Sequence, residues 1–432
     1  MTVQSSSNSV KIAASPGQER HRLKILRICQ ETPYPPTDGV RIEPYFITKF
    51  MALRGHEITL LCFQSDARDV TPMREWCDLH TVPFDGRNTP FNLVRGVIER
   101  FPVNYIKYRD QRLLAAVFRL LGTGNFDVAV VDYSALGWFA LQIKNRFPLT
   151  PVVTRWLNLD TLIWERWSGL EGHGLKRTLG KIQTGFVREF ETQLAYASDL
   201  CLTIGAKDTE LLHQMAPSAN VEFLPAGIDV EHYAFQPVSA ARALLFLASS
   251  YKWHANSDAV KWLHDEIMPR IWARHPETLL YITGADHTPE MQRWTGDGRV
   301  VLTGFVPDER EVAAKCRVLV VPMRLGAGIK LKILTSFAMG KPVVTTSQGA
   351  EGVAGLGDGK HCLVRDSAED FADGVAELLD NDELHRRLAA SGRELVSRTY
   401  DWRTLAGQWE QLLLSVVQRK HGQVEEAAAS MV

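Results

Sequence analysis

Cysteine is scarce in this chain, and its scarcity narrows the class of protein. Six cysteines occur in 432 residues, and no two of them have the spacing of a metal-binding pair. They are Cys29, Cys62, Cys77, Cys201, Cys316 and Cys362. Several lie in apolar stretches, so we expect the reduced, buried thiols of a cytosolic protein rather than a disulfide framework.

Long apolar runs and an excess of charge are missing as well. No apolar run reaches the length that crosses a membrane, and the Ser-rich first 20 residues lack the apolar core of a signal peptide. The 49 basic residues are balanced by 50 acidic ones, which argues against a general nucleic-acid partner. We therefore expect a cytoplasmic location, with residues 1–21 and the tail after Gly422 disordered.

Short apolar strands alternate with amphipathic helices along the rest of the chain. Strands are predicted at 23–28, 57–63, 79–82, 128–131, 152–154, 200–203, 221–224, 243–248, 279–283, 300–302, 318–321 and 343–345. Alternation of this kind, repeated twice, predicts an α/β protein with two doubly wound, Rossmann-like domains. The Pro- and Gly-rich segment 225–237 separates them, giving domains at 22–228 and 238–400 and a terminal helix at 401–420.

A glycine turn joins the predicted strand at 318–321 to a predicted helix at 329–339. Gly326 and Gly328 permit a tight turn, and a strand–turn–helix unit presents backbone N–H groups and a positive helix end to a phosphate. Lys330 and Lys332 stand at the start of the helix, where cations oppose the helix dipole unless an anion is bound. The alternative is a purely structural turn with solvated lysines.

A second glycine turn, from Gly349 to Gly352, follows the next predicted strand and contains Glu351. Ligands of doubly wound sheets bind at the carboxyl ends of the strands, so both turns lie at the ligand-binding edge. The loop containing Gly39 follows the first strand of the first domain. We expect these loops of the two domains to face each other.

Several segments along nearly the whole ordered chain share their order and spacing with one known family. They are residues 33–41, 54–57, 225–233, 251–259, 303–306, 326–342, 349–352 and 401–402. Together they resemble the family-4 retaining glycosyltransferases with the GT-B fold, the glycosyl transferases group 1. This resemblance implies an α/β GT-B architecture with the donor in the second domain and the acceptor mainly in the first.

The resemblance also implies an activity. It points to a hexosyltransferase-type enzyme that moves a sugar from a nucleotide-sugar donor to a glycan or lipid-linked acceptor with retained configuration. The pathway it implies is bacterial-type polysaccharide or glycoconjugate synthesis, with no required metal or other cofactor. A departing nucleoside diphosphate gains negative charge, which cations and N–H groups stabilise.

The site residues follow from the matching positions. We assign catalysis to Lys330, Glu351 and Asp160. Donor binding is assigned to Gly326, Gly328, Lys330, Lys332, Thr335, Lys252, Gly349, Gly352 and Gly39. For Asp160 and Glu165, a salt bridge with Arg155 or Arg166 is the alternative.

The chain departs from the family pattern at several of these positions. Ala327 and Thr335 stand where the family often has glutamates, and Ser249 and Ser250 where an arginine is common, with Lys252 as its substitute. Two other functions therefore stay open. A nucleotide-sugar epimerase of the same fold needs a set of carboxylates, and few stand at these loops. A non-catalytic GT-B partner subunit is favoured by Ala327 and Thr335.

Two basic stretches of the first domain leave peripheral membrane contact open, at the inner face of the plasma membrane. Residues 87–119 contain seven basic residues against Glu99 and Asp110. The helix near 175–196 has an apolar face at Leu175, Leu179, Ile182, Phe186 and Phe190, with Lys176, Arg177, Lys181 and Arg188 elsewhere on it. Such a helix lies on an anionic membrane or packs as an ordinary surface helix.

Overall fold

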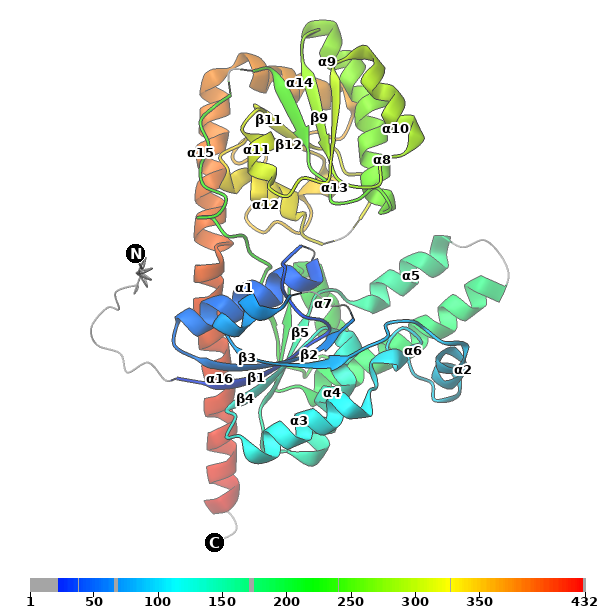
Figure 1. Cartoon of the computed structure of the whole chain (residues 1–432), viewed down its shortest axis with the longest axis vertical. Coiled ribbons are helices and arrows are strands. Elements are labelled where there is room, and N and C mark those ends of the chain that lie inside the picture. Colours follow the sequence, from blue (N-terminus) through cyan, green and yellow to red (C-terminus); the bar gives the residue numbers. More distant parts are fainter. Residues whose placement is uncertain are drawn as a thin grey trace, which may run out of the picture.

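Two parallel β-sheets, each covered by helices, make up the molecule (Figure 1). The computed structural model describes residues 22–37, 39–65, 69–170, 175–239, 241–326 and 328–429. The predicted disordered segment 1–21 and Ala327 lie outside these ranges. The two doubly wound α/β domains confirm the predicted fold class.

The first sheet has seven strands in the order β3-β2-β1-β4-β5-β6-β7. Its strands are β1 (Lys24–Cys29), β2 (Glu57–Gln64), β3 (Asp78–Pro83), β4 (Val128–Asp132), β5 (Val152–Trp156), β6 (Leu200–Thr203) and β7 (Val221–Phe223). The connecting helices are α1 (Gly39–Leu53), η1 (Thr71–Glu75), α2 (Pro90–Ile98), η2 (Ile106–Tyr108), α3 (Gln111–Thr123), η3 (Ser134–Leu136), α4 (Gly137–Arg146), α5 (Asp160–Leu170), α6 (Leu175–Ala197) and α7 (Ala206–Met215). β4, β5 and β6 are buried throughout because helices cover both faces.

The second sheet has six strands in the order β10-β9-β8-β11-β12-β13. They are β8 (Ala243–Phe246), β9 (Leu279–Thr283), β10 (Val300–Gly304), β11 (Val318–Val321), β12 (Val343–Thr345) and β13 (Leu363–Val364). Its helices are α8 (His254–Trp262), η4 (Leu263–Ile267), α9 (Met268–Arg274), α10 (Pro289–Trp294), η5 (Thr295–Asp297), α11 (Glu309–Ala313), α12 (Leu331–Ala338), α13 (Ser347–Ala350), α14 (Ala368–Asp380) and α15 (Asp382–Thr399). The predicted strands coincide with observed ones to within two residues, and β13 was not predicted.

The chain crosses between the domains at 225–229 and again at 400–402, and the two crossings are bonded together. Ile228 N donates to Tyr400 O at 2.7 Å, and Trp402 N donates to Ile228 O at 3.2 Å. A Cβ atom on Gly227 would lie 2.7 Å from Tyr400 O, so only glycine fits there. This pairing holds the two linkers side by side.

The terminal helix α16 (Trp402–Ala429) runs back along the first domain (Figure 1). The Trp402 ring stacks on Phe46 of α1 with centroids 5.7 Å apart, and Arg54 and His56 both bind Glu410. The backbone stays helical to Ala429, so the predicted disorder after Gly422 is wrong for this stretch. Its Glu and Ala residues are strong helix formers that extend the docked helix.

A buried ionic network lies between α1, α16 and the centre of the first sheet. Arg27 Nε donates to Asp132 Oδ2 at 2.7 Å, while Glu43 accepts from Arg27 at 3.1 Å and from Arg155 at 3.2 Å. The Trp409 ring lies 5.7 Å from both guanidinium groups. Arg155 therefore forms its salt bridge with Glu43 and not with Asp160 or Glu165, as the alternative above proposed. Removing one partner of such a network would leave an uncompensated buried charge, which is strongly destabilising.

The cysteines agree with the sequence prediction. All six are free thiols, five of them are buried, and Cys77 is partly buried. Burial raises the pKa of the Cys62 and Cys316 thiols to about 12. They are inert core residues rather than nucleophiles.

Candidate functional site

The loop between β11 and α12 forms the predicted glycine turn. Gly326 has a φ of +100° and Gly328 a φ of +73°, which L side chains rarely adopt, so both positions require glycine. The helix begins at Leu331 with Lys330 at its N-cap, two residues later than predicted. The turn is therefore two residues longer than predicted.

The second glycine turn packs directly on the first. Gly352 has a φ of +86°, and a Cβ atom there would lie 2.9 Å from the carbonyl carbon of Gly328. Gln348 Nε2 donates to Gly326 O at 2.6 Å and also to the Glu351 carboxylate. Gly349 N donates to Thr346 Oγ1 at 2.9 Å. The structure therefore brings both predicted turns into one assembly, which we call the double turn (residues 326–330 and 348–352).

Lys330 lies inside the double turn. Its side chain is buried, and Nζ donates to Gly328 O at 2.9 Å and to Gly326 O at 3.4 Å. The alternative of solvated lysines is therefore wrong for Lys330. A buried ammonium group surrounded by a glycine backbone is a preorganised positive charge, since it needs little reorganisation to meet an anion.

Lys332 lies in the first turn of α12 and packs within the second domain. Its Nζ donates to Asn256 Oδ1 at 3.0 Å and lies 4.7 Å from the centre of the Phe246 ring. Burial, together with the nearby charge of Lys330, lowers the pKa of Lys332 to about 7. Lys332 is therefore close to losing its charge at neutral pH and would regain it beside a bound anion.

Glu351 connects the two domains. It accepts hydrogen bonds from Gln348 and from Lys207, which lies at the start of α7 in the first domain. Burial alone would raise the pKa of Glu351, but the hydrogen bonds from Lys207 and Gln348 hold it below its usual range. The carboxylate is thus ionised, and α7 contacts the double turn where Figure 1 shows α7 below α12 and α13.

The remaining residues that the sequence assigns to donor binding are Lys252, Thr335 and Gly39, and they lie outside the double turn. Lys252 is exposed and forms an ion pair with Asp286 at 2.9 Å rather than with either turn. Thr335 is buried within α12, and Gly39 is the first residue of α1 in the first domain. The loop after β8 does reach the site through another residue, because a Cβ atom on Gly326 would lie 3.3 Å from the Trp253 ring.

Asp160 lies in a buried cluster within the first domain. Its Oδ2 accepts from the Tyr105 hydroxyl at 2.7 Å, and its backbone N–H donates to Glu191 at 2.9 Å. Its Oδ1 is buried and has no hydrogen-bond partner among the described residues. Burial raises the pKa of Asp160, and it raises the pKa of Glu191 to about 8. Tyr133, with a φ of +75°, completes this acid cluster (Tyr105, Tyr133, Asp160 and Glu191).

Glu165 forms a salt bridge, as the alternative above describes, but its partner differs from the expected one. Its carboxylate accepts from Arg188 of α6 at 2.8 Å. Arg166 was the expected partner, and its side chain lies outside the described residues. Lys207 and Trp253 contact the double turn without any local sequence signal, because they come from α7 and from the loop after β8.

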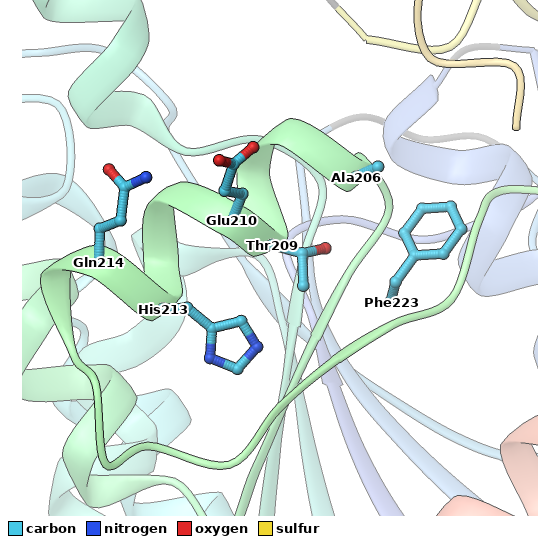
Figure 2. Close-up of a pocket in the computed structure, with 6 residues that line it drawn as sticks. All are labelled: Ala206, Thr209, Glu210, His213, Gln214 and Phe223. Atoms are coloured by element: carbon cyan, nitrogen blue, oxygen red, sulfur yellow. The ribbon is translucent and has the colours of Figure 1, made fainter.

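A pocket of about 550 Å³ opens beside α7, next to the helix end that holds Lys207 (Figure 2). It is lined by Ala206, Thr209, Glu210, His213, Gln214 and Phe223. In Figure 2, His213 and Phe223 flank an open space in front of the helix. None of the predicted site residues lines it, so the pocket is separate from the double turn.

Within the described ranges, no three His, Cys, Asp or Glu side chains gather as a metal site. In the same part of the chain, no helix is both long and apolar enough to cross a bilayer. The expectation that no metal is required stays a prediction.

Sequence comparison finds one family match, within the second domain, and a longer match to a curated protein. Residues 241–381 match the family model described as Glycosyl transferases group 1. The chain is 28% identical over 269 residues to glycogen synthase of Mycobacterium tuberculosis, covering 58% of this chain and 60% of that protein. It thus spans less than two thirds of the curated relatives it matches.

Solved structures extend the likeness to both domains. Sucrose-phosphate synthase from Thermosynechococcus elongatus aligns with a TM-score of 0.63 at 16% identity, covering 92% of this chain and all of that one. HepE from Anabaena, solved in complex with UDP and glucose, aligns with a TM-score of 0.60 at 14% identity over 91% of this chain and 100% of its own. WaaG, a glycosyltransferase involved in lipopolysaccharide biosynthesis, aligns with a TM-score of 0.60 at 16% identity over 90% of this chain and 99% of its own. These alignments confirm the GT-B fold.

Proposed function

We propose that the protein is a glycosyltransferase whose nucleotide-sugar donor binds at the double turn. The packing of Gly352 on Gly328, with Lys330 buried between glycine carbonyls, carries the proposal. The matched family region contains both turns, and the UDP complexes of HepE support a nucleoside diphosphate as the ligand. Lys330, Lys332 and the backbone N–H groups of the turns stabilise the diphosphate charge.

The reaction we propose is a substitution at the anomeric carbon. The bond from this carbon to the diphosphate oxygen breaks, and its electron pair leaves with the nucleoside diphosphate. An acceptor hydroxyl oxygen forms the new bond and gives its proton to a departing phosphate oxygen. Lys330 favours the transition state because it meets charge that grows on the leaving group.

The finer assignments rest on the resemblance described above. We propose retention of configuration, a hexose as the transferred sugar, no required metal, and a glycan or lipid-linked acceptor in polysaccharide or glycoconjugate synthesis. Glu351 is assigned to the transferred sugar because it is ionised and lies in the double turn. Asp160 is assigned to the acceptor side because its Oδ1 lacks a partner among the described residues. A cytoplasmic location belongs to the same proposal.

Lys252, Thr335 and Gly39 have supporting roles in this proposal. Lys252 reaches the donor only by leaving Asp286, and its exposed position allows that change. Thr335 offers one hydroxyl rather than a carboxylate, and Gly39 gives the first-domain loop a close approach.

A non-catalytic partner subunit is the second candidate. It is favoured by Thr335, which is buried at a position where the family often has a glutamate. Such a subunit would keep the double turn and bind a nucleotide without turnover. Product formation, and not nucleotide binding, therefore distinguishes the two candidates.

A thermal-shift panel of nucleotide sugars, followed by product analysis, tests the proposal. Ligand at 100 times its Kd stabilises the native state by about 2.7 kcal/mol, so the right donor raises the melting temperature clearly. The free sugar is the matched control and should cause no shift. Hydrolysis or transfer from the stabilising donor supports the enzyme, and stabilisation without any turnover supports the partner subunit. If nucleotide sugars and nucleoside diphosphates all leave the melting temperature unchanged, both candidates are wrong.

A further inference from the structure

Helix α2 presents its apolar side outward. Five of its nine residues are large apolar side chains that are exposed: Phe91, Leu93, Val94, Val97 and Ile98. Phe91 is 73% exposed and Ile98 is 76% exposed. Residues 91, 94 and 98 share one face of a helix, and residues 97 and 93 extend this face to one side. This outward orientation is the reverse of an ordinary surface helix.

The helix is nevertheless well formed and held in place. Thr89 caps its start by accepting from Asn92 N at 3.1 Å, and Pro90 occupies the first turn. Gly96 is its buried residue, and a Cβ atom there would lie 3.1 Å from both Phe101 O and the Val103 side chain. The side of α2 that contains Gly96 therefore packs on the protein, and the side with the large apolar residues faces outward.

The segment that contains α2 is rich in positive charge. Residues 85–112 contain six basic and three acidic residues, a surplus of three positive charges in a chain whose net charge is -1. Arg95 and Arg109 both bind Glu99, while Arg100 pairs with Glu189 of α6 at 3.7 Å. Because Glu99 serves two arginines, a surplus of two positive charges remains even when Glu189 is counted with these residues.

The neighbouring helix α6 extends the surface. Leu179 and Ile182 are exposed, and Arg100 lies 5.8 Å from the Phe186 ring. Phe190, by contrast, is buried in the first-domain core, so the apolar face predicted for this helix is divided between the core and the surface. In Figure 1, α2 lies beside α6 at the outer edge of the first domain.

We propose that the apolar face of α2 docks on an anionic lipid surface. Exposed apolar side chains rimmed by positive charge match a bilayer with negative headgroups, because both the apolar and the electrostatic terms then favour contact. A second copy of this chain fits less well, since its own positive rim would face that of the first. The proposal does not depend on glycosyl transfer.

Vesicle flotation of the full chain without any nucleotide sugar tests this docking. The wild type should float with vesicles of phosphatidylcholine and phosphatidylglycerol in equal parts, and not with phosphatidylcholine alone. The double variant F91S/I98S should lower the partition coefficient by roughly tenfold or more, because two apolar side chains no longer enter the bilayer. Both side chains are exposed, so the fold should be kept.

Leu149→Ser provides the matched control, because Leu149 is 65% exposed in the same domain but lies outside α2. It should float as the wild type does. Equal flotation of F91S/I98S and wild type would overturn the proposal, as would equal binding to neutral vesicles. A wild-type dimer in sedimentation that F91S/I98S makes monomeric, without vesicle binding, would show a self-association face and also overturn it. Thermal shifts with nucleotide sugars are independent of these outcomes.

Discussion

The polar site of the second domain is built from backbone groups, whereas that of the first domain is built from side chains. In the second domain, the double turn is built from the backbone of two glycine loops, with Lys330 bonded to carbonyl groups. In the first domain, the acid cluster is built from side chains, and Asp160 and Glu191 are shielded among tyrosines. Under the proposed function, the double turn exchanges these internal bonds for bonds to the donor. The acid cluster has most of its polar atoms bonded within the domain, so we expect it to affect stability first.

Gly352→Ala, in the double turn, should have the largest effect on donor affinity. The new Cβ atom would lie 2.9 Å from the Gly328 carbonyl carbon, so the two turns must move apart. We expect donor affinity, measured by calorimetry with UDP-glucose as the probe, to fall roughly 100-fold as the bonds to the diphosphate are lost.

Gly359→Ala is the control for backbone strain. Gly359 also has a positive φ, +67°, but nothing lies within 4 Å of a Cβ atom there. This variant should lose about 1 kcal/mol of unfolding free energy and keep its donor affinity. Equal donor affinities of the Gly352→Ala and Gly359→Ala variants would show that the contact between the turns does not make the site.

Lys330→Ala should have the next largest effect. Hydrogen bonds to charged groups contribute about 1.5–3 kcal/mol, so the donor Kd should rise roughly tenfold or more, with turnover falling in parallel. Lys332→Ala should act in the same direction but less, because Lys332 is only partly charged near its pKa of about 7. Lys360→Ala, an exposed lysine of the same domain, serves as the control. Unchanged affinity in both single variants and in their double variant would refute the assignment.

Glu191→Gln should separate stability from binding in the first domain. The native state holds a proton on Glu191 up to its pKa of about 8, whereas the ordinary value is 4.5. Between these values the native state binds more protons than the unfolded state, so stability falls as pH rises through this window. We expect Glu191→Gln to reduce that fall, by about 5 °C in melting temperature between pH 5 and 8, with donor affinity unchanged.

Glu189→Gln, an exposed neighbour on α6, is the control for this measurement. It should keep the wild-type pH dependence of melting. If Glu191→Gln melts with the wild-type pH profile, the acid cluster does not hold a proton in the native state. If it weakens the donor instead, the two polar centres are coupled and the comparison between the domains fails.

The same contrast explains what could be predicted from the sequence. The double turn comes from two nearby stretches whose glycines and lysines stand next to predicted strands, so strand periodicity placed both turns after the carboxyl ends of β11 and β12, where the structure has them. The acid cluster gathers four residues that lie far apart in the sequence: Tyr105 just before η2, Tyr133 just after β4, Asp160 in α5 and Glu191 in α6. No local pattern encodes such a meeting, and only Asp160 was singled out.

Other differences have the same physical origin. Lys252 was expected at the donor, but the loops after β8 and β9 run side by side, with Ser250 bridged to Ala285, and this brings Asp286 to Lys252. The pattern of α2 marks it as amphipathic but not which side faces outward. That orientation depends on Gly96 packing against residues 101 and 103, which the sequence does not encode locally.

Amide hydrogen exchange with and without UDP-glucose tests the central claim most directly, because the claim concerns backbone N–H groups. Binding at the double turn should slow exchange within 326–332 and 348–352 and leave residues 90–98 of α2 unchanged. The amides of Asp160 and Thr161, already bonded to Glu191, should also stay unchanged. Slowed exchange confined to the first domain, or no change in the two turns at saturating UDP-glucose, would contradict the account.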